Sequence, residues 1–299
     1  MKSRPLLHVG MPKCASTWLQ MHLFKPRHGF RQALFPFATY LDFISPSSFY
    51  CSHPGSKVEL DKPDGLVPVI SSEVLIGSPL TGGAEGETNL YRLHNAFPDA
   101  RILIVIREQN AMLRSLYKLL VNFGLPYKIE TVLFNDLVGN VPTFDLKYLC
   151  YDYKIEAYQQ AFGKDSVLVL PYEQFKLKPK QFLDAIRLFC EIEPDHYPIQ
   201  ANMDKRENTN RSLVSLEIKR LYNRYIAKTK FSMEGLYKPT QISGRANFNP
   251  LVPLVVERWL EKRFAAKVVR MTDGFYAESN ARTETLANLS LGEYGYQLP

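Results

Sequence analysis

The chain has 299 residues, of which 45% are hydrophobic and 22% charged, the composition of an ordinary globular protein and not of a disordered one. Its formal net charge of +7 favours anionic partners. The apolar run at the N-terminus stops at Pro12, too soon for a signal sequence or a membrane span, so we expect a cytoplasmic protein.

Short apolar runs alternate with helical patterns along the first two thirds of the chain. Apolar runs of this kind indicate buried strands of a parallel sheet. The predicted strands are Leu6–Met11, Val67–Ile70, Arg101–Ile106 and Ser166–Leu170. The predicted helices begin near Ser16, run through Tyr117 to about Phe123, follow Glu173 to about Cys190, and cover Leu213–Ile226 and Val252–Met271. We read Phe30–Tyr50 as an aromatic-rich insertion and Phe231–Pro250 as a long loop.

This order of elements predicts an α/β fold, a P-loop-like parallel sheet flanked by helices on both faces with a helical C-terminal part. We expect one domain over residues 1–299, with its core in 5–190 and a basic helical part in 200–299. The segment Lys205–Lys230 has eight Lys or Arg residues and two Glu, hence a charge of +6. It is either a solvated helix face or a surface for an anionic cofactor or polymer. No nucleic-acid-binding motif accompanies it, so we expect no nucleic-acid partner.

The cysteines and histidines have no spacing typical of a metal site. We therefore expect no metal, and cysteines that are structural or incidental. The cysteines are Cys14, Cys51, Cys150 and Cys190.

The segment Gly10–Leu19 (GMPKCASTWL) takes the chain from the first strand into a helix. The free N–H groups and dipole of a helix start attract anions, and Lys13 adds a positive charge. Ser16 and Thr17 can donate from their hydroxyls, although Ser and Thr also cap ordinary helices. The segment is not a Walker A loop, because no Gly-Lys-Ser/Thr follows.

This segment resembles the 5′-phosphosulfate loop of the sulfotransferase superfamily, Pro-Lys-(Thr/Ser/Ala)-Gly-(Ser/Thr)-Thr-Trp-Leu. The resemblance implies that Lys13 contacts the leaving phosphate and the sulfuryl group, and that Trp18 packs on adenine. It implies that the 5′-phosphate is held by Cys14, Ala15, Ser16 and Thr17. Ala15 stands where glycine is usual, and its methyl group allows fewer backbone conformations than glycine can adopt.

A second phosphate-binding pattern follows the strand Arg101–Ile106. Arg107 can bind a phosphate in a bidentate manner, and Ser115 follows about two turns into the next helix. Each has an ordinary alternative, a surface ion pair for the arginine and a back-bonded hydroxyl for the serine. The pair resembles the family's 3′-phosphate motif, an Arg with a Ser eight residues later. Tyr172 resembles the tyrosine that lies near the nucleotide in this family. The alternative interpretation is an ordinary half-buried tyrosine at the end of a strand.

The closing motif of the animal cytosolic enzymes is absent from this sequence. Other residues must then close over the nucleotide. The candidates are Lys205, Arg206, Arg211 and Arg245.

Transfer to an acceptor hydroxyl needs a general base. Glu73 follows the second strand at the sheet edge where ligands bind in open α/β folds. It resembles the catalytic glutamate of carbohydrate sulfotransferases. The alternative interpretation is that Ser72 caps a helix and that Glu73 merely lies in the first turn of that helix. His53 and His94 are less well placed.

The sequence therefore predicts a sulfotransferase that uses 3′-phosphoadenosine 5′-phosphosulfate (PAPS), releases 3′,5′-ADP and needs no metal. The expected acceptor is a hydroxyl of a small molecule or glycan, including anionic ones, with a carbohydrate or glycolipid favoured. Two alternatives stay open, an ATP-dependent P-loop kinase and a non-enzymatic binder of anionic polymers. Oligomeric state is not readable from the sequence.

Overall fold

The computed structural model describes residues 4–34, 65–133, 144–193, 212–228 and 253–299. The chain divides into two compact units. Unit 1 comprises Met1–Glu108, Asn140–Glu207 and Tyr276–Pro299, and unit 2 comprises Gln109–Gly139 and Asn208–Phe275. The prediction of a single domain stays a prediction. In the part of the chain that the structure describes, no helix has the length and apolar character needed to cross a membrane.

Unit 1 is built on a parallel sheet of five strands in the order β2-β3-β1-β4-β5. The strands are β1 (Leu6–His8), β2 (Phe30–Leu34), β3 (Val67–Ser71), β4 (Arg101–Ile106) and β5 (Val167–Pro171). Every residue of β1, β3 and β4 is buried, as expected for strands covered on both faces. The predicted α/β class is confirmed.

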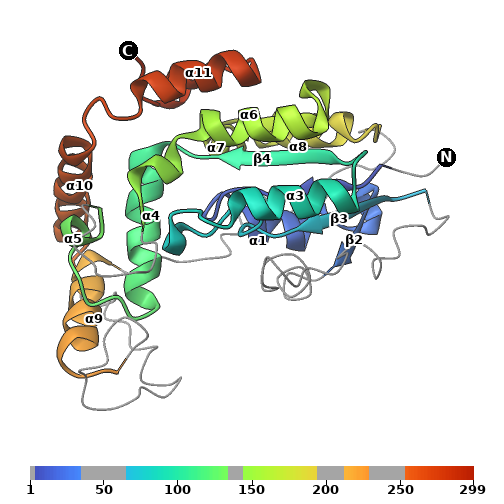
Figure 1. The fold of residues 1–299 in the computed structure, drawn as a ribbon. Helices are drawn as coiled ribbons and strands as arrows, with labels where there is room; N and C mark the ends of the chain where they lie inside the picture. Colours follow the sequence, from blue (N-terminus) through green and yellow to red (C-terminus); the bar gives the residue numbers. More distant parts are fainter. Residues whose placement is uncertain (1–3, 35–64, 134–143, 194–211, 229–252) are drawn as a thin grey trace. The chain divides into compact units, whose positions relative to one another are not determined.

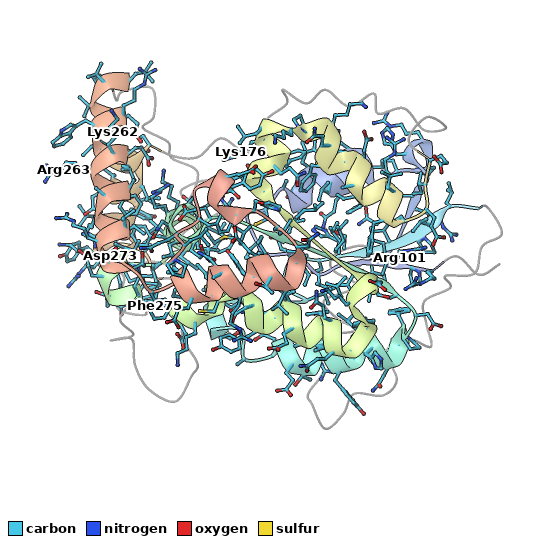
Figure 2. The ribbon with its side chains drawn as sticks, turned by 90° about the horizontal axis from the view of Figure 1, so that it is seen from above. Arg101, Lys176, Lys262, Arg263, Asp273 and Phe275 are labelled. Atoms are coloured by element: carbon cyan, nitrogen blue, oxygen red, sulfur yellow. The ribbon has the colours of Figure 1, made fainter. Side chains whose placement is uncertain are left out.

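Helices flank this sheet (Figure 1). They are α1 (Ser16–Trp18), α3 (Gly86–Ala96), α6 (Tyr151–Phe162), α7 (Tyr172–Leu177), α8 (Pro179–Phe189) and α11 (Ala277–Ala287). Shorter helical turns are η1 (Leu19–Leu23), η2 (Pro26–His28), η5 (Pro79–Thr81), η6 (Leu146–Leu149), η7 (Lys164–Ser166) and η11 (Leu291–Tyr294). Figure 2 shows α8 and α6 to either side of the strands. The C-terminal α11 packs on α6, where Arg282 pairs with the buried Asp152 at 3.1 Å.

Unit 2 is helical in its described residues. It contains α4 (Gln109–Asn122), α5 (Ile129–Leu133), α9 (Leu213–Tyr225) and α10 (Leu254–Met271). Helix α4 packs against both α9 and α10. The buried Asn223 amide donates to the carbonyl oxygens of Val121 (2.8 Å) and Leu125 (3.2 Å), and so holds α9 to the C-terminal end of α4. Arg220 donates to Pro126 O at 3.0 Å and reinforces this junction.

The structure corrects several predicted elements. Residues 30–34, assigned to an insertion, form β2, whose pairing with β3 is a long-range contact that no local pattern reveals. The helix predicted to run to about Cys190 is split between α7 and α8, because Pro179 cannot donate the hydrogen bond that would continue α7. Helices α3, α5, α6 and α11 were not predicted. Residues 231–250 lie outside the described residues.

Candidate functional site

Three charged residues of the prediction follow the carboxyl ends of neighbouring strands. Lys13 comes after β1, Glu73 after β3 and Arg107 after β4. Strand β1 lies between the other two, so all three side chains start from one edge of the sheet. In open α/β sheets this edge is where ligands bind.

The loop between β1 and α1 has an unusual backbone. Lys13 (φ 64°) and Ala15 (φ 63°) both have left-handed backbones, and Cys14 between them is not among the residues with positive φ. Alternation of this kind turns successive N–H groups inward and forms an anion-binding nest. A residue with a Cβ carries a cost of about 1–2 kcal/mol in this conformation. Ala15 has this cost, and it occupies the position at which the 5′-phosphosulfate loop of sulfotransferases usually has glycine.

The side chains of the loop take different directions. Cys14 is fully buried, and burial raises the pKa of its thiol well above the usual value. Only the backbone of Cys14 is then available to a ligand. Thr17 is exposed, whereas the buried Ser16 hydroxyl donates to a carboxylate oxygen of Glu73. The predicted base and the predicted phosphate loop are therefore in direct contact.

Lys13 is partly buried beside two other charges. Burial lowers the pKa of its ammonium group, the Glu73 carboxylate acts against that shift, and the Arg107 guanidinium adds to it. A lysine with a lowered pKa gives up its proton more readily than a solvated one. Lys13 is thus suited to neutralise or protonate an oxygen on which negative charge develops.

Arg107 is held by contacts from three directions. Its Nη1 donates to Lys13 O at 3.1 Å, and its guanidinium lies 4.9 Å from the centre of the Tyr172 ring. The Tyr151 hydroxyl donates to Arg107 O at 2.6 Å. The Nε of Arg107 is buried and has no hydrogen-bond partner among the residues that the structure describes. A buried charged donor left unpaired is costly, and a bound anion would satisfy it.

Glu173, to which the sequence analysis gave no role, holds the backbone next to Arg107. Its carboxylate accepts from the Glu108 amide at 3.3 Å and from the Tyr296 hydroxyl at 3.1 Å. Burial raises the pKa of Glu173. The C-terminal segment of the chain therefore supports the residue that follows Arg107. The Tyr-Glu pair after β5 was visible in the sequence, but no signal linked it to Tyr296.

The predicted aromatic residues lie together. The rings of Trp18 and Phe175 are 5.0 Å apart, and Phe175 in turn stacks on Tyr172 at 6.2 Å. Lys176 Nζ lies 4.6 Å from the centre of the Tyr172 ring. Trp18 is buried, and its Nε1 has no hydrogen-bond partner in the described part of the chain. The cluster gives Arg107 an apolar neighbour suited to a flat base.

A buried polar group that the sequence analysis missed underlies the loop. His8, at the end of β1, shares a hydrogen bond of 2.7 Å with Ser71 Oγ, at the end of β3. Gln20, just beyond α1, donates to the same oxygen at 3.0 Å. Burial lowers the pKa of His8 to about 4. A Cβ at position 10 would lie 2.6 Å from His8 Nε2, which explains glycine there.

The remaining predicted residues are less well defined. Ser115 is buried in α4, which belongs to unit 2, whereas Arg107 belongs to unit 1. The predicted partnership of Ser115 with Arg107 stays a prediction. His94 packs edge-on against Phe162, with ring centres 5.2 Å apart. The other candidates, His53, Lys205, Arg206, Arg211 and Arg245, lie outside the described residues.

Comparison with known proteins gives a family and a fold. Residues 87–196 match the sulfotransferase family, a range that includes Arg107, Ser115 and Tyr172 but not the loop at Lys13. A sulfotransferase from Alicyclobacillus acidocaldarius has a similar structure, with a TM-score of 0.56 and 16% identity over 97% of this chain and 98% of that one. A search of curated proteins gave no match.

Two more solved structures resemble the chain more weakly. The sulfotransferase domain from the curacin biosynthetic pathway has a TM-score of 0.44 and 11% identity over 99% of both chains. A mouse sulfotransferase complexed with PAP has a TM-score of 0.37 and 12% identity, over 97% of this chain and 90% of that one. The family match, with the fold, confirms the predicted superfamily and the prediction of an enzyme.

Proposed function

Since the chain is an enzyme of the sulfotransferase superfamily, we propose that it transfers the sulfuryl group of PAPS to a carbohydrate or glycolipid hydroxyl and releases 3′,5′-ADP. The observation that carries this proposal is the meeting of Lys13, Glu73 and Arg107 at one sheet edge, around a loop with an alternating backbone. Two groups suited to phosphate lie there, the loop N–H groups and the unpaired Arg107 Nε.

The donor would be held at both of its phosphate ends. The N–H groups of Cys14 to Thr17, with Lys13, suit the 5′-phosphosulfate. Arg107 and Ser115 are assigned to the 3′-phosphate, and Trp18 and Tyr172 to the adenine. A nucleotide without a 3′-phosphate would leave the Nε of Arg107 unpaired, so selectivity for 3′,5′-ADP over ATP follows from this assignment.

In the proposed reaction the acceptor oxygen attacks sulfur in line with the bond to the 5′-phosphate. A new O–S bond forms, the old S–O bond breaks, and its electron pair goes to the departing phosphate oxygen, where Lys13 stabilises the charge. Glu73 takes the acceptor proton. The Ser16 hydroxyl orients one carboxylate oxygen of Glu73 and leaves the other for this role. No step requires a metal.

The donor assignment is tested by thermal unfolding with added nucleotide. We expect 3′,5′-ADP to raise the melting temperature strongly and ATP with Mg²⁺ to raise it little. Stabilisation by ATP and not by 3′,5′-ADP would instead indicate a kinase. Retention on heparin with no response to either nucleotide would indicate a non-enzymatic binder of anionic polymers.

The catalytic assignment is tested with Lys13→Ala and Glu73→Gln, assayed with labelled PAPS against a panel of carbohydrate, glycolipid, phenolic and amine acceptors. Each variant should lower turnover by about 10²–10⁴-fold, the usual contribution of one acid-base or charge-stabilising group. Glu73→Gln should bind 3′,5′-ADP nearly normally. The matched controls are Lys164→Ala and Glu87→Gln, both exposed in the structure. Full activity of Glu73→Gln would remove Glu73 from the mechanism, and transfer to phenols alone would refute the acceptor class.

A further inference from the structure

Helix α10 uses one of its faces to pack within unit 2. Glu257 accepts from the Leu213 amide at 2.8 Å, and Glu261 pairs with Lys118 of α4. Phe264 lies 5.8 Å from the ring of Tyr117. Both acidic residues of α10 are thus engaged on this inner face.

The opposite face of α10 is exposed and bears only positive charges. At 100° per residue, its residues fall within about 140° of the helix circumference. They are Val255, Arg258, Trp259, Lys262, Arg263, Ala266, Val269 and Arg270, all exposed, and we call this set the α10 outer face. Four of the eight are cations, and none is acidic.

The middle of the α10 outer face is apolar and is flanked by cations, with Arg258 and Lys262 on one side and Arg270 and Arg263 on the other. Val269 is the exception, since it lies between Arg258 and Lys262. Val255 and Trp259, which are 78% and 53% exposed, lie near the middle of the arc. Arg258 lies at one edge and Arg263 at the other. The Arg263 guanidinium covers part of the Trp259 ring at 4.6 Å. In Figure 2 the labelled Lys262 and Arg263 project from the helix.

We propose that the α10 outer face binds the surface of a bilayer that contains anionic lipid. An apolar strip flanked by cations is the pattern of helices that lie in a membrane interface, with the apolar residues at the acyl boundary and the cations at the headgroups. A soluble polyanion would pair with the cations but leave Val255 and Trp259 in water. A bilayer satisfies both kinds of residue.

The test is sedimentation of the full chain with vesicles of phosphatidylcholine alone and of an equal mixture of phosphatidylcholine and phosphatidylglycerol. We expect binding to the mixed vesicles and little to phosphatidylcholine. The double variant Arg258→Gln/Lys262→Gln should lower the partition coefficient by about 25-fold, at about fivefold for each cation near an anionic surface. Lys164→Gln/Lys180→Gln, a double variant at exposed lysines of unit 1, loses the same charge and should bind like the unchanged chain.

Tryptophan fluorescence distinguishes a bilayer from other polyanions. The chain has two tryptophans, and because Trp18 is only 6% exposed, a blue shift on adding mixed vesicles would come from Trp259. Trp259→Ala should abolish the shift and weaken sedimentation. Equal sedimentation of the Arg258→Gln/Lys262→Gln and Lys164→Gln/Lys180→Gln variants would overturn the proposal. So would retention on heparin without vesicle binding or a Trp259 shift. None of these measurements depends on sulfuryl transfer.

Discussion

The two segments of unit 1 that we propose to bind phosphate, the loop Lys13–Trp18 and the strand end at Arg107, are held in place in different ways. The loop is shaped by its own backbone, with left-handed residues at Lys13 and Ala15, and rests near the buried His8 and Ser71. Arg107 leaves a regular strand and is held by side chains from other parts of the chain.

The geometry of the loop thus depends on nearby residues, whereas the position of Arg107 depends on residues far away in the sequence. A loop shaped by its own φ angles can form wherever its sequence allows them. The support of Arg107 exists only when α6, α7 and the C-terminal segment have assembled around it, through Tyr151, Glu173 and Tyr296. Substitutions can therefore weaken one segment and spare the other.

The largest expected effect is at His8, below the loop. Its pKa in the folded protein is about 4, against an ordinary 6.5, so the native state favours the neutral ring. The stability that this contributes is complete above pH 6.5 and is lost as the pH falls towards 4, by about 3 kcal/mol at 1.36 kcal/mol per unit. In His8→Gln that part of the pH dependence should vanish, as measured by urea unfolding at neutral pH and near pH 4.

The comparison of His8→Gln with the unchanged chain cancels the contribution of other groups that titrate in this range. An identical loss of unfolding free energy in both proteins would show that His8 is not the group responsible.

An intermediate effect is expected at Tyr296, which supports the Arg107 side. Tyr296→Phe removes one of the hydrogen bonds to the half-buried Glu173 and should loosen the backbone that presents Arg107. We expect binding of 3′,5′-ADP to weaken by about tenfold, the size of one lost hydrogen bond to a charged group. Binding of 5′-AMP should hardly change, because it has no phosphate for Arg107. Titration calorimetry with 3′,5′-ADP and with 5′-AMP measures the two changes in affinity.

Tyr225→Phe is the control for this substitution, since Tyr225 lies exposed in unit 2. Equal losses for 3′,5′-ADP and 5′-AMP in Tyr296→Phe would mean general damage to the fold and not a loss of support for Arg107.

The smallest effect is expected at Ala15, within the loop. Glycine adopts the left-handed backbone without the Cβ penalty, although it loses more entropy on folding. Ala15→Gly should therefore raise the free energy of unfolding by about 0.5–1 kcal/mol, seen as a higher melting temperature. Ala157→Gly, inside α6, should lower it by about 1 kcal/mol. A lower free energy of unfolding in both variants would mean that the backbone of Ala15 is not strained.

Much of the fold was predictable because its signals are local. The strand Arg101–Ile106 was predicted with the bounds that the structure gives, since six consecutive buried residues leave a clear apolar run. Strand β2 was missed because its residues look like the rest of an aromatic segment until they pair with β3. The break between α7 and α8 was missed although Pro179 marks it.

The sequence by itself determined the family, the parallel α/β fold and the two segments that we propose to bind a nucleotide, because strand-loop-helix patterns and residue spacings are properties of short stretches of chain. Only the tertiary structure decided how those segments are supported. The contact of Ser16 with Glu73 spans 57 positions, that of Glu108 with Glu173 spans 65, and that of Glu173 with Tyr296 spans 123. Such contacts depend on the path of the whole chain, and no local pattern encodes them.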